Sequence, residues 1–193
     1  GNHLIHLVRR NIDLNVLLFN NRIYGLTKGQ YSPTSEAGKK TKSSPFGSLE
    51  RPFQPLGLAL GAGSTFLART VDIFAKDVRE VLTESENHRG TAFVEILQNC
   101  VIFNDKAFSE ISDRKVREER CLFLKHGEPM VFGSKDAPKG LRMNGVRLEV
   151  VDLGDEFSAE DCLVHDRHDR MLAGLLVQLD FPEYPVPMGI LYQ

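Results

Sequence analysis

The sequence lacks several features that would point directly to a class of protein. Of its 193 residues, 24 are Lys or Arg and 26 are Asp or Glu, so the net charge is −2 and there is no basic excess. A nucleic-acid-binding surface needs clustered Lys and Arg side chains, and we therefore expect no nucleic-acid partner. The apolar runs, such as residues 55–62, are far too short to cross a bilayer, so we expect no membrane partner.

Cysteine is scarce, and a methionine is missing from the start of the sequence. Cys100, Cys121 and Cys162 form no CxxC pair, and an odd number of cysteines argues against a disulfide framework. No stretch reads as a signal peptide, because the N-terminal arginines follow the apolar residues instead of preceding them, and we expect a cytoplasmic protein. The first methionine is Met130, which predicts a fragment, a processed chain or a trimmed chain.

Short apolar runs alternate with amphipathic stretches over the first hundred residues. The expected helices cover residues 2–10, 52–60 and 72–88, and the expected strands cover residues 15–19, 65–68 and 91–97. The length and the flanks of the first strand predict that it is buried. Strands and helices of these lengths in alternation indicate parallel βαβ units, and therefore an α/β fold.

The character of the sequence changes after Phe108, where charged residues and glycines become frequent. Further strand-like runs and one more helix are expected at residues 121–124, 130–132, 148–151 and 169–179, followed by an extended proline-rich tail. No linker separates this part from the preceding one. We therefore predict an α/β core over residues 1–108 and a C-terminal extension over residues 109–193, without a second independent domain.

The chemically informative stretch is NNRIYGLTKGQ, residues 20–30, which directly follows the first expected strand. In open parallel sheets, ligands bind beyond the carboxyl ends of the strands. Asn oxygens and backbone carbonyls are hard ligands suited to Mg²⁺, and Gly25 and Gly29 would let the backbone approach phosphates closely. On turn chemistry alone, however, a plain turn is the more common explanation of such a stretch.

The same residues, read as a string, resemble one half of a known motif. NNRIYGLTKGQYSPTSE, residues 20–36, is similar at nearly every position to the end of the thiamine-diphosphate motif in β subunits of 2-oxoacid:ferredoxin oxidoreductases. The similarity continues through residues 1–11, 40–70 and 93–108 and is looser beyond them. The Gly-Asp-Gly half of the motif and most of the family's cluster cysteines would lie upstream of Gly1.

This resemblance implies both a fold and an activity. The fold is the thiamine-diphosphate-binding α/β fold, a parallel sheet flanked by helices, here without its N-terminal strands and with a C-terminal extension. The activity is oxidative decarboxylation of a 2-oxoacid to an acyl-coenzyme A and CO₂, with electrons passing through a [4Fe–4S] cluster to ferredoxin. The implied cofactors are thiamine diphosphate, Mg²⁺ and the cluster, and the implied protein partners are an α subunit and ferredoxin.

Several functions stay open within this resemblance. Residues 32–53 are most similar to members that use 2-oxoglutarate, and a pyruvate or broad 2-oxoacid enzyme is the runner-up. A non-redox thiamine-diphosphate enzyme and an inactive, truncated packing module also stay open. The Gln-Asn-Cys sequence at residues 98–100 speaks against the non-redox enzyme.

The resemblance also implies roles for single residues in the loop. Asn21 would give its side-chain oxygen to Mg²⁺, and Ile23 its backbone carbonyl. Gly25, Leu26 and Thr27 would then line the diphosphate. No catalytic residue is expected in this chain, because the glutamate that activates the cofactor belongs, in this family, to the α subunit or domain.

Lysines beside these positions have both a functional and an ordinary interpretation. Lys28 lies among cofactor-binding positions, and an anionic 2-oxoacid needs a cation, so we predict that it faces the substrate carboxylate. The competing interpretation is a plain surface lysine. Lys39, Lys40 and Lys42 fit a mobile lid and an ordinary polar loop equally well.

Of the three cysteines, one has a functional interpretation. Cys100 follows the strand expected at residues 91–97 and precedes a Phe-Asn pair, a setting similar to that of the family's remote fourth cysteine. We predict that it is a thiolate ligand of a [4Fe–4S] cluster, the competing interpretation being a small buried residue. Cys121 and Cys162 are expected in the core.

Two groups of histidines receive structural explanations. His3 and His6 are one helical turn apart with no carboxylate nearby, which favours a helix surface over a metal site. Residues 165–169, His-Asp-Arg-His-Asp, include metal-ligand types, but the intervening Arg and the expected helix start favour a capped, solvated turn.

Overall fold

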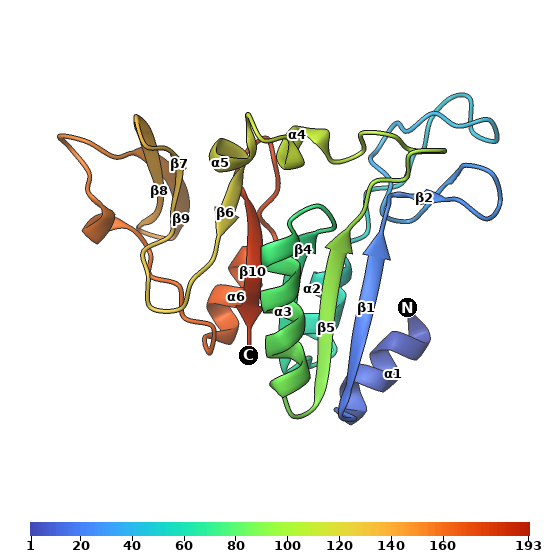
Figure 1. Ribbon diagram of the computed structural model, residues 1–193, viewed down its shortest axis with the longest axis horizontal. Coiled ribbons are helices and arrows are strands. Elements are labelled where there is room, and N and C mark those ends of the chain that lie inside the picture. Colours follow the sequence, from blue (N-terminus) through green and yellow to red (C-terminus); the bar gives the residue numbers. More distant parts are fainter.

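The computed structural model describes residues 1–193 and is built around a five-stranded sheet (Figure 1). The order is β1-β5-β4-β10-β6, in which β1 (Leu14–Asn20), β5 (Thr91–Leu97) and β4 (Phe66–Val71) are parallel. β10 (Val186–Tyr192) runs antiparallel to β4 and parallel to β6 (Cys121–Phe123). The predicted α/β fold with a mainly parallel sheet is confirmed.

Helices cover the two faces of this sheet unequally. The side chains of α1 (Asn2–Arg10), α2 (Pro55–Gly61) and α6 (Arg170–Leu176) pack on one face, in a cluster that includes residues of β4, β5 and β10. The helix α3 (Ala75–Asn87) packs on the other face, where Val81 meets buried residues of β4 and β5. Because both faces of β4 and β5 are covered, every residue of these two strands is buried.

Most helix and strand predictions in the first hundred residues agree with the structure. α1 and β5 have the predicted bounds. α2 begins at Pro55 instead of residue 52, with this proline in its first turn as the missing N–H allows. β4 extends to Val71 and α3 starts at Ala75, three residues later than predicted, because Asp72 is engaged elsewhere: its carboxylate accepts the N–H of Asn99 at 3.2 Å.

The prediction that the first strand is buried is wrong. β1 lies at the edge of the sheet, and its burial alternates from residue to residue. Val16 and Leu18 pack against the main core, whereas Leu17 is 40% exposed and Phe19 is 61% exposed. The apolar run alone did not show that α3 covers β4, β5 and β10 but leaves this face of β1 open.

The C-terminal part contributes to the central sheet and also forms a sheet of its own. The tail that was expected to be only extended is the strand β10, which sits between β4 and β6. β7 (Val131–Ser134), β8 (Ala137–Asn144) and β9 (Arg147–Asp152) form a separate antiparallel sheet. β8 was not predicted, because Pro138 and Gly140 hide its pattern.

The remaining elements are short. They are the two-stranded β2 (Ile23–Tyr24) and β3 (Gln30–Tyr31), the single-turn helices α4 (Ser109–Ser112) and α5 (Arg117–Arg120), and the 3₁₀ turn η1 (Ala159–Asp161). No helix combines the length and the apolar character that a membrane span requires.

The cysteines are all free thiols, in agreement with the absence of a disulfide framework. Cys121 and Cys162 are buried as predicted, whereas Cys100 is partly exposed. Burial raises the pKa of the Cys121 thiol to about 12 and also raises the pKa of Cys162. Neither buried thiol is therefore suited to react near neutral pH.

Candidate functional site

The loops that carry the candidate site leave the same edge of the central sheet. β1 and β5 are parallel neighbours, and their last residues, Asn20 and Leu97, lie side by side. The backbone N–H of Gln98 donates to the carbonyl of Asn20 at 2.9 Å, which continues the ladder past both strands. Asn21 and Gln98 therefore start their loops together, and the Asn21 Nδ2 lies 3.5 Å from the Gln98 Oε1.

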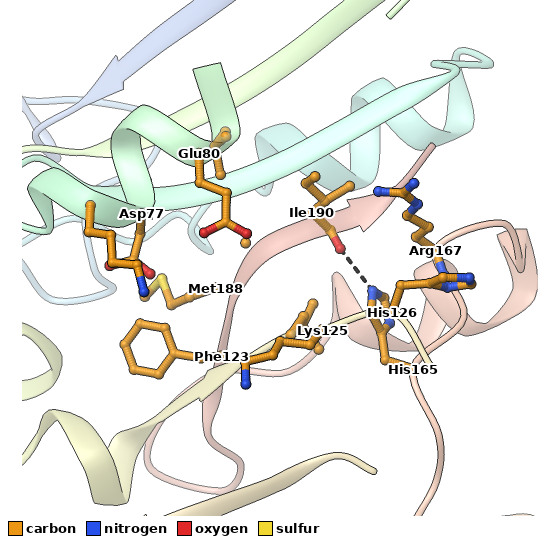
Figure 2. Close-up of a pocket in the computed structure, with 13 residues that line it drawn as sticks. Asp77, Glu80, Phe123, Lys125, His126, His165, Arg167, Met188 and Ile190 are labelled. Atoms are coloured by element: carbon orange, nitrogen blue, oxygen red, sulfur yellow. Dashed lines mark hydrogen bonds between the residues drawn. The ribbon is translucent and has the colours of Figure 1, made fainter. Parts of the chain in front are cut away.

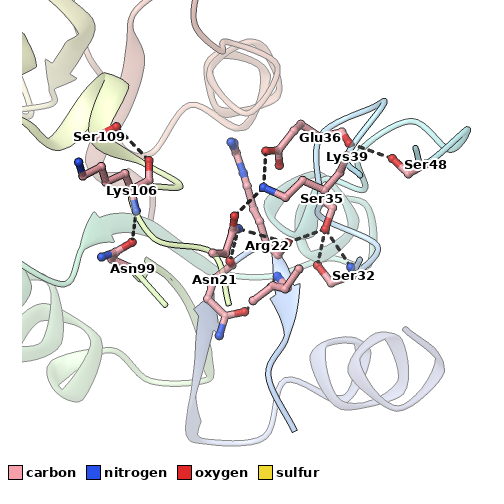
Figure 3. Close-up of polar contacts among 12 residues, drawn as sticks. Asn21, Arg22, Ser32, Ser35, Glu36, Lys39, Ser48, Asn99, Lys106 and Ser109 are labelled. Carbon is pink, nitrogen blue, oxygen red and sulfur yellow. Dashed lines mark hydrogen bonds and ion pairs between the residues drawn. The ribbon is translucent and has the colours of Figure 1, made fainter. Parts of the chain in front are cut away.

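The Asn-Asn pair folds the chain into a tight turn. The side-chain oxygen of Asn20 accepts the N–H of Arg22 at 3.2 Å, and that of Asn21 accepts the N–H of Ile23 at 3.2 Å. Both are side-chain-to-backbone turns of the kind that Asn favours. Arg22 has a positive φ of 55°, and the Ser35 hydroxyl holds it there by donating to the Arg22 carbonyl (Figure 3).

A buried polar chain supports this turn from inside the sheet. Asn20 donates from Nδ2 to Oε1 of Glu95 at 2.8 Å, and Arg69 donates from Nε to Oε2 of the same carboxylate at 2.8 Å. Glu95 is only 2% exposed. Burying a carboxylate costs free energy unless it is paired. The three hydrogen-bonded side chains therefore tie the end of β1 to β5 and β4. The sequence prediction missed these residues, although one Glu inside an apolar strand is a readable signal.

Asn104 joins the turn to the segment that carries Cys100. Its side-chain Nδ2 donates to the carbonyl of Asn21 at 3.0 Å, and its backbone N–H donates to the carbonyl of Cys100 at 2.9 Å. Its side-chain Oδ1 accepts from the ammonium of Lys39 at 2.6 Å. One buried asparagine thus holds three segments together; its place after Phe103 supported the resemblance but did not indicate these contacts.

Lys39 is also paired with Glu36 in the same loop. The two charged groups are 3.0 Å apart (Figure 3). Burial opposes ionisation of the Glu36 carboxyl, but hydrogen bonds from its own backbone N–H and from Lys39 outweigh that effect and lower its pKa. The ion pair therefore ties Lys39 to Glu36 within the loop.

Four lysines surround one pocket beside the turn. The pocket has a volume of about 570 Å³ and is lined by Ile23, Lys28, Gly29, Lys39, Lys40, Thr41, Lys42, Ile102 and Phe103. Like charges gather here without a carboxylate in the lining, which favours an anionic ligand. The structure therefore brings Lys28 together with the three lysines that could equally have been an ordinary loop.

The other predicted cofactor positions lie at the rim of this region. Leu26 is 98% exposed, and Thr27 and Lys28 are exposed beside it. Gly25 and Gly29 lie against the ring of Phe103, and a Cβ on Gly29 would come within 3.2 Å of that ring. In this structure the two glycines leave room for the ring of Phe103, and their expected approach to a phosphate stays a prediction.

The residues present fit a magnesium ion with an anionic cofactor. The Asn21 side-chain oxygen uses one lone pair for the Ile23 N–H, and a second lone pair is available to a hard cation. Ile23 is buried, so its backbone is held in place beside the turn. The four lysines supply positive charge for phosphate or carboxylate oxygens next to that point.

A second pocket, of about 300 Å³, lies between α3 and the strands β6 and β10 (Figure 2). His165 lines it and is 1% exposed, so the prediction of a solvated turn is wrong for this residue. Its Nε2 lies 2.9 Å from the carbonyl of Ile190, and burial lowers its pKa. The predicted cap is confirmed, since Asp169 accepts the N–H of Met171 at 2.8 Å at the start of α6.

Comparison with known proteins identifies the family. Residues 1–96 match the family described as thiamine pyrophosphate enzyme, C-terminal TPP binding domain. Over 184 residues, or 95% of the chain, the sequence is 50% identical to the 2-oxoglutarate oxidoreductase subunit KorB of Mycobacterium tuberculosis, of which it covers 46%. The chain belongs to the 2-oxoacid:ferredoxin oxidoreductase β-subunit family.

Two further members support this assignment. The chain is 45% identical over 103 residues to the 2-oxoacid:ferredoxin oxidoreductase 1 subunit beta of Aeropyrum pernix, covering 53% of this chain and 32% of that one. The solved structure of 2-oxoglutarate:ferredoxin oxidoreductase from Magnetococcus marinus, with 2-oxoglutarate, coenzyme A and succinyl-CoA bound, superposes with a TM-score of 0.70 at 27% identity.

The chain corresponds to only part of these relatives. The Magnetococcus marinus match covers 100% of this chain and 51% of the other, and the KorB match covers 46% of that subunit, so the chain spans about half the length of the relatives it matches. The expected thiamine-diphosphate-binding fold is confirmed for this chain. The roles of Asn21, Ile23, Lys28 and Cys100, and those of Gly25, Leu26 and Thr27, stay predictions.

Proposed function

We propose that this chain is part of the β subunit of a 2-oxoglutarate:ferredoxin oxidoreductase. The whole enzyme would convert 2-oxoglutarate and coenzyme A to succinyl-CoA and CO₂ and pass two electrons to ferredoxin. The observation that carries the proposal is 50% identity to the KorB subunit over 95% of the chain. When bound, thiamine diphosphate supplies the chemistry that releases CO₂ from a 2-oxoacid, and the protein positions it.

In this proposal the turn after β1 holds the metal end of the cofactor. Asn21 gives its side-chain oxygen and Ile23 its carbonyl to Mg²⁺, and Gly25, Leu26 and Thr27 lie along the diphosphate. Asn104 acts as a positioning residue, because its side chain holds the Asn21 carbonyl at 3.0 Å. The buried Glu95 fixes the preceding Asn20. A metal-binding residue whose backbone is held from both sides loses little conformational freedom when the ion binds, and this favours affinity for the ion.

The lysine-lined pocket is the proposed place of the substrate's charged groups. A 2-oxoglutarate molecule carries two carboxylates, and Lys28 shares the pocket with Lys39, Lys40 and Lys42. Lys39 already serves Glu36 and Asn104, so Lys28 is the better candidate for a substrate carboxylate. A monocarboxylic 2-oxoacid such as pyruvate would make less use of this charge.

Cys100 is the proposed ligand of the [4Fe–4S] cluster. It is a free and partly exposed thiol, as an incoming cluster requires, whereas Cys121 and Cys162 are buried. Asn104 bonds to the backbone of both Cys100 and Asn21, so the proposed cluster ligand and the proposed magnesium ligand are two hydrogen bonds apart. Electrons that leave the cofactor would then have a short path to the cluster.

The same edge of the sheet offers a surface for the α subunit. Large apolar side chains are exposed on its loops, namely Leu26, Phe46, Leu49, Val101 and Ile102. An apolar group of this kind is characteristic of a protein-protein contact. The cytoplasmic location expected from the sequence stays a prediction.

The test uses the complete enzyme, with its α subunit and a purified ferredoxin. We expect ferredoxin reduction that depends on coenzyme A and is faster with 2-oxoglutarate than with pyruvate, together with the broad visible absorption of an iron–sulfur cluster. Preference for pyruvate would indicate the pyruvate or broad 2-oxoacid class. Thiamine-dependent activity without iron would indicate a non-redox enzyme, and cofactor-free protein would indicate a packing module.

A further inference from the structure

Two histidines and an aspartate from distant parts of the chain meet on the surface. His126 follows β6, whereas Asp166 and His168 lie just before α6. Each offers a ligand atom, and these atoms all lie within 4.8 Å of one another. The strands β6 and β10 run antiparallel to β4. The segment after β6 therefore lies at the opposite end of the strands from the loop of residues 20–30 (Figure 1).

The backbone around the three side chains is well ordered. The segment after His126 pairs with the segment before Asp166 through three main-chain hydrogen bonds of 2.7–3.0 Å, which join Gly127 to His165, His165 to Glu128, and Met130 to Leu163. His165 itself is buried between them. The ligand types are therefore presented from a paired scaffold and not from free loops, which reduces the entropy lost on binding an ion.

The hydrogen bond of the His168 ring leaves one of its nitrogens free for a metal. The Nδ1 of His168 lies 2.9 Å from the carbonyl of Gln193, which can only accept, so this nitrogen carries the hydrogen and the lone pair is on Nε2. A ring nitrogen that donates to a carbonyl while the other stays free is the usual arrangement of metal-bound histidines. The two rings, of His126 and His168, lie edge to face with centroids 5.1 Å apart.

The ring of His126 faces the carboxylate of Asp166. Its Nδ1 accepts the N–H of Arg167 over a long 3.3 Å, and it lies 3.5 Å from the Oδ1 of Asp166. That carboxylate oxygen already accepts the N–H of His168 at 2.9 Å. Both atoms accept a backbone N–H and lie close together, so a cation bound between them would replace the long Arg167 hydrogen bond at His126 Nδ1.

We propose that His126, Asp166 and His168 bind one divalent transition-metal ion of the Zn²⁺ or Co²⁺ class. Two imidazoles and one carboxylate are ligands that such borderline ions prefer. Zinc–ligand bonds of about 2.1 Å place ligand atoms roughly 3.4 Å apart, so ligand atoms that now lie within 4.8 Å of one another need to approach by up to about 1.4 Å. All three are exposed, so water completes the coordination.

The ion would act as a structural clamp away from the candidate cofactor site. It would join the connection between β6 and β7 to the turn before α6 and, through His168, to the carbonyl of Gln193. Residues 165–169 alone indicate only a capped turn, because the third ligand, His126, is 40 positions away from Asp166. The fold supplies what the local sequence lacks.

The test is a titration of the untagged protein with Zn²⁺ and with Co²⁺. A Cys100→Ser background removes the one partly exposed thiol as a competing ligand. We expect one equivalent of Zn²⁺ by calorimetry and visible absorption bands on adding Co²⁺. His126→Ala and His168→Ala should each weaken binding at least about tenfold, and the double variant should abolish it.

Two further variants separate metal binding from folding. Asp166→Asn keeps an acceptor for the His168 N–H but loses the charge, and it should also weaken Zn²⁺ binding about tenfold. The double variant His3→Ala/His6→Ala removes two exposed histidines on α1 and should leave binding unchanged. Equal affinity in the His126→Ala/His168→Ala protein, or no binding up to about millimolar Zn²⁺, would overturn the proposal.

Discussion

The centre of the sheet and its open margin are built in opposite ways. β4 and β5 are buried on both faces, and their charged residues, Arg69 and Glu95, are paired with each other. β1 at the margin is covered on one face only, and the loop that follows it holds exposed residues around a lysine-lined pocket. We infer from this difference that the centre mainly stabilises the fold and that the margin mainly binds ligands.

The two regions are nevertheless joined by a few polar contacts. Asn20 at the end of β1 bonds to Glu95, and Asn104 bonds to the backbone of Asn21. A change in the centre should therefore lower the free energy of unfolding. A change at the margin should lower affinity and reduce the free energy of unfolding by no more than about 1 kcal/mol.

The largest expected effect comes from removing the buried carboxylate at the centre. Glu95→Ala leaves Arg69 buried without its partner and Asn20 without its acceptor. We expect the free energy of unfolding, measured by urea denaturation, to fall by roughly 3–5 kcal/mol. Glu86→Ala, on the exposed end of α3, is the matched control and should change stability by less than about 0.5 kcal/mol.

A loss of under about 1 kcal/mol in Glu95→Ala would contradict the central role of the pair. Replacement of both charged residues by apolar ones of similar size refines the test, because buried ion pairs are often replaceable as a unit. Arg69→Met/Glu95→Leu should therefore recover part of the stability that the single variant loses. It should not restore the fixed position of Asn20.

The next largest effect is expected at the margin and concerns the affinity for thiamine diphosphate. In the complete enzyme, Asn21→Ala removes the proposed magnesium ligand, and we expect affinity for thiamine diphosphate in the presence of Mg²⁺ to fall at least about 100-fold. Asn15→Ala, an exposed position on β1, is the control. Wild-type affinity in Asn21→Ala, measured by calorimetry, would remove Asn21 from the site.

Lys28→Ala should have a smaller effect, and on the substrate. Loss of one cation from a pocket with four lysines should raise the KM for 2-oxoglutarate roughly tenfold, with thiamine diphosphate affinity unchanged. Lys135→Ala, on an exposed turn between β7 and β8, is the control. Unchanged KM and turnover in Lys28→Ala would show that Lys28 is an ordinary surface lysine.

The division between centre and margin also explains what could be predicted from the sequence. β5 and α1 were predicted with correct bounds, because an apolar run or a helical period reports burial locally. The open face of β1 depends on where α3 packs, and β10 depends on a partner 122 positions earlier, where Ile190 lies opposite Ala68. Such long-range pairing leaves little local signal.

The candidate site shows the same limit. The turn at Asn20 and Asn21 was identified from its residues, since side-chain-to-backbone bonds of Asn are local. Asn104 could not be identified, because its contacts are to Asn21, Lys39 and Cys100, two of them far away in the sequence. Glu95 could have been flagged, since a charge in an apolar strand implies a buried partner.

The smallest expected effect is at the Lys39–Glu36 pair, where the margin contributes to stability. Lys39→Met removes the ion pair and the bond to Asn104 but keeps the length of the side chain. Because the pair is partly exposed, we expect the free energy of unfolding to fall by no more than about 1 kcal/mol at neutral pH.

The pH dependence of this loss has a definite sign. The folded-state pKa of Glu36 lies below its ordinary value of 4.5, so its contribution is fully present above that value and is lost as the pH falls through the lower folded-state pKa. The difference in unfolding free energy between wild type and Lys39→Met should therefore shrink as the pH falls below 4.5 and through the lower folded-state pKa, as urea denaturation would measure. A difference that stays constant or grows on acidification would show that Lys39 acts through Asn104 alone and that Glu36 contributes nothing.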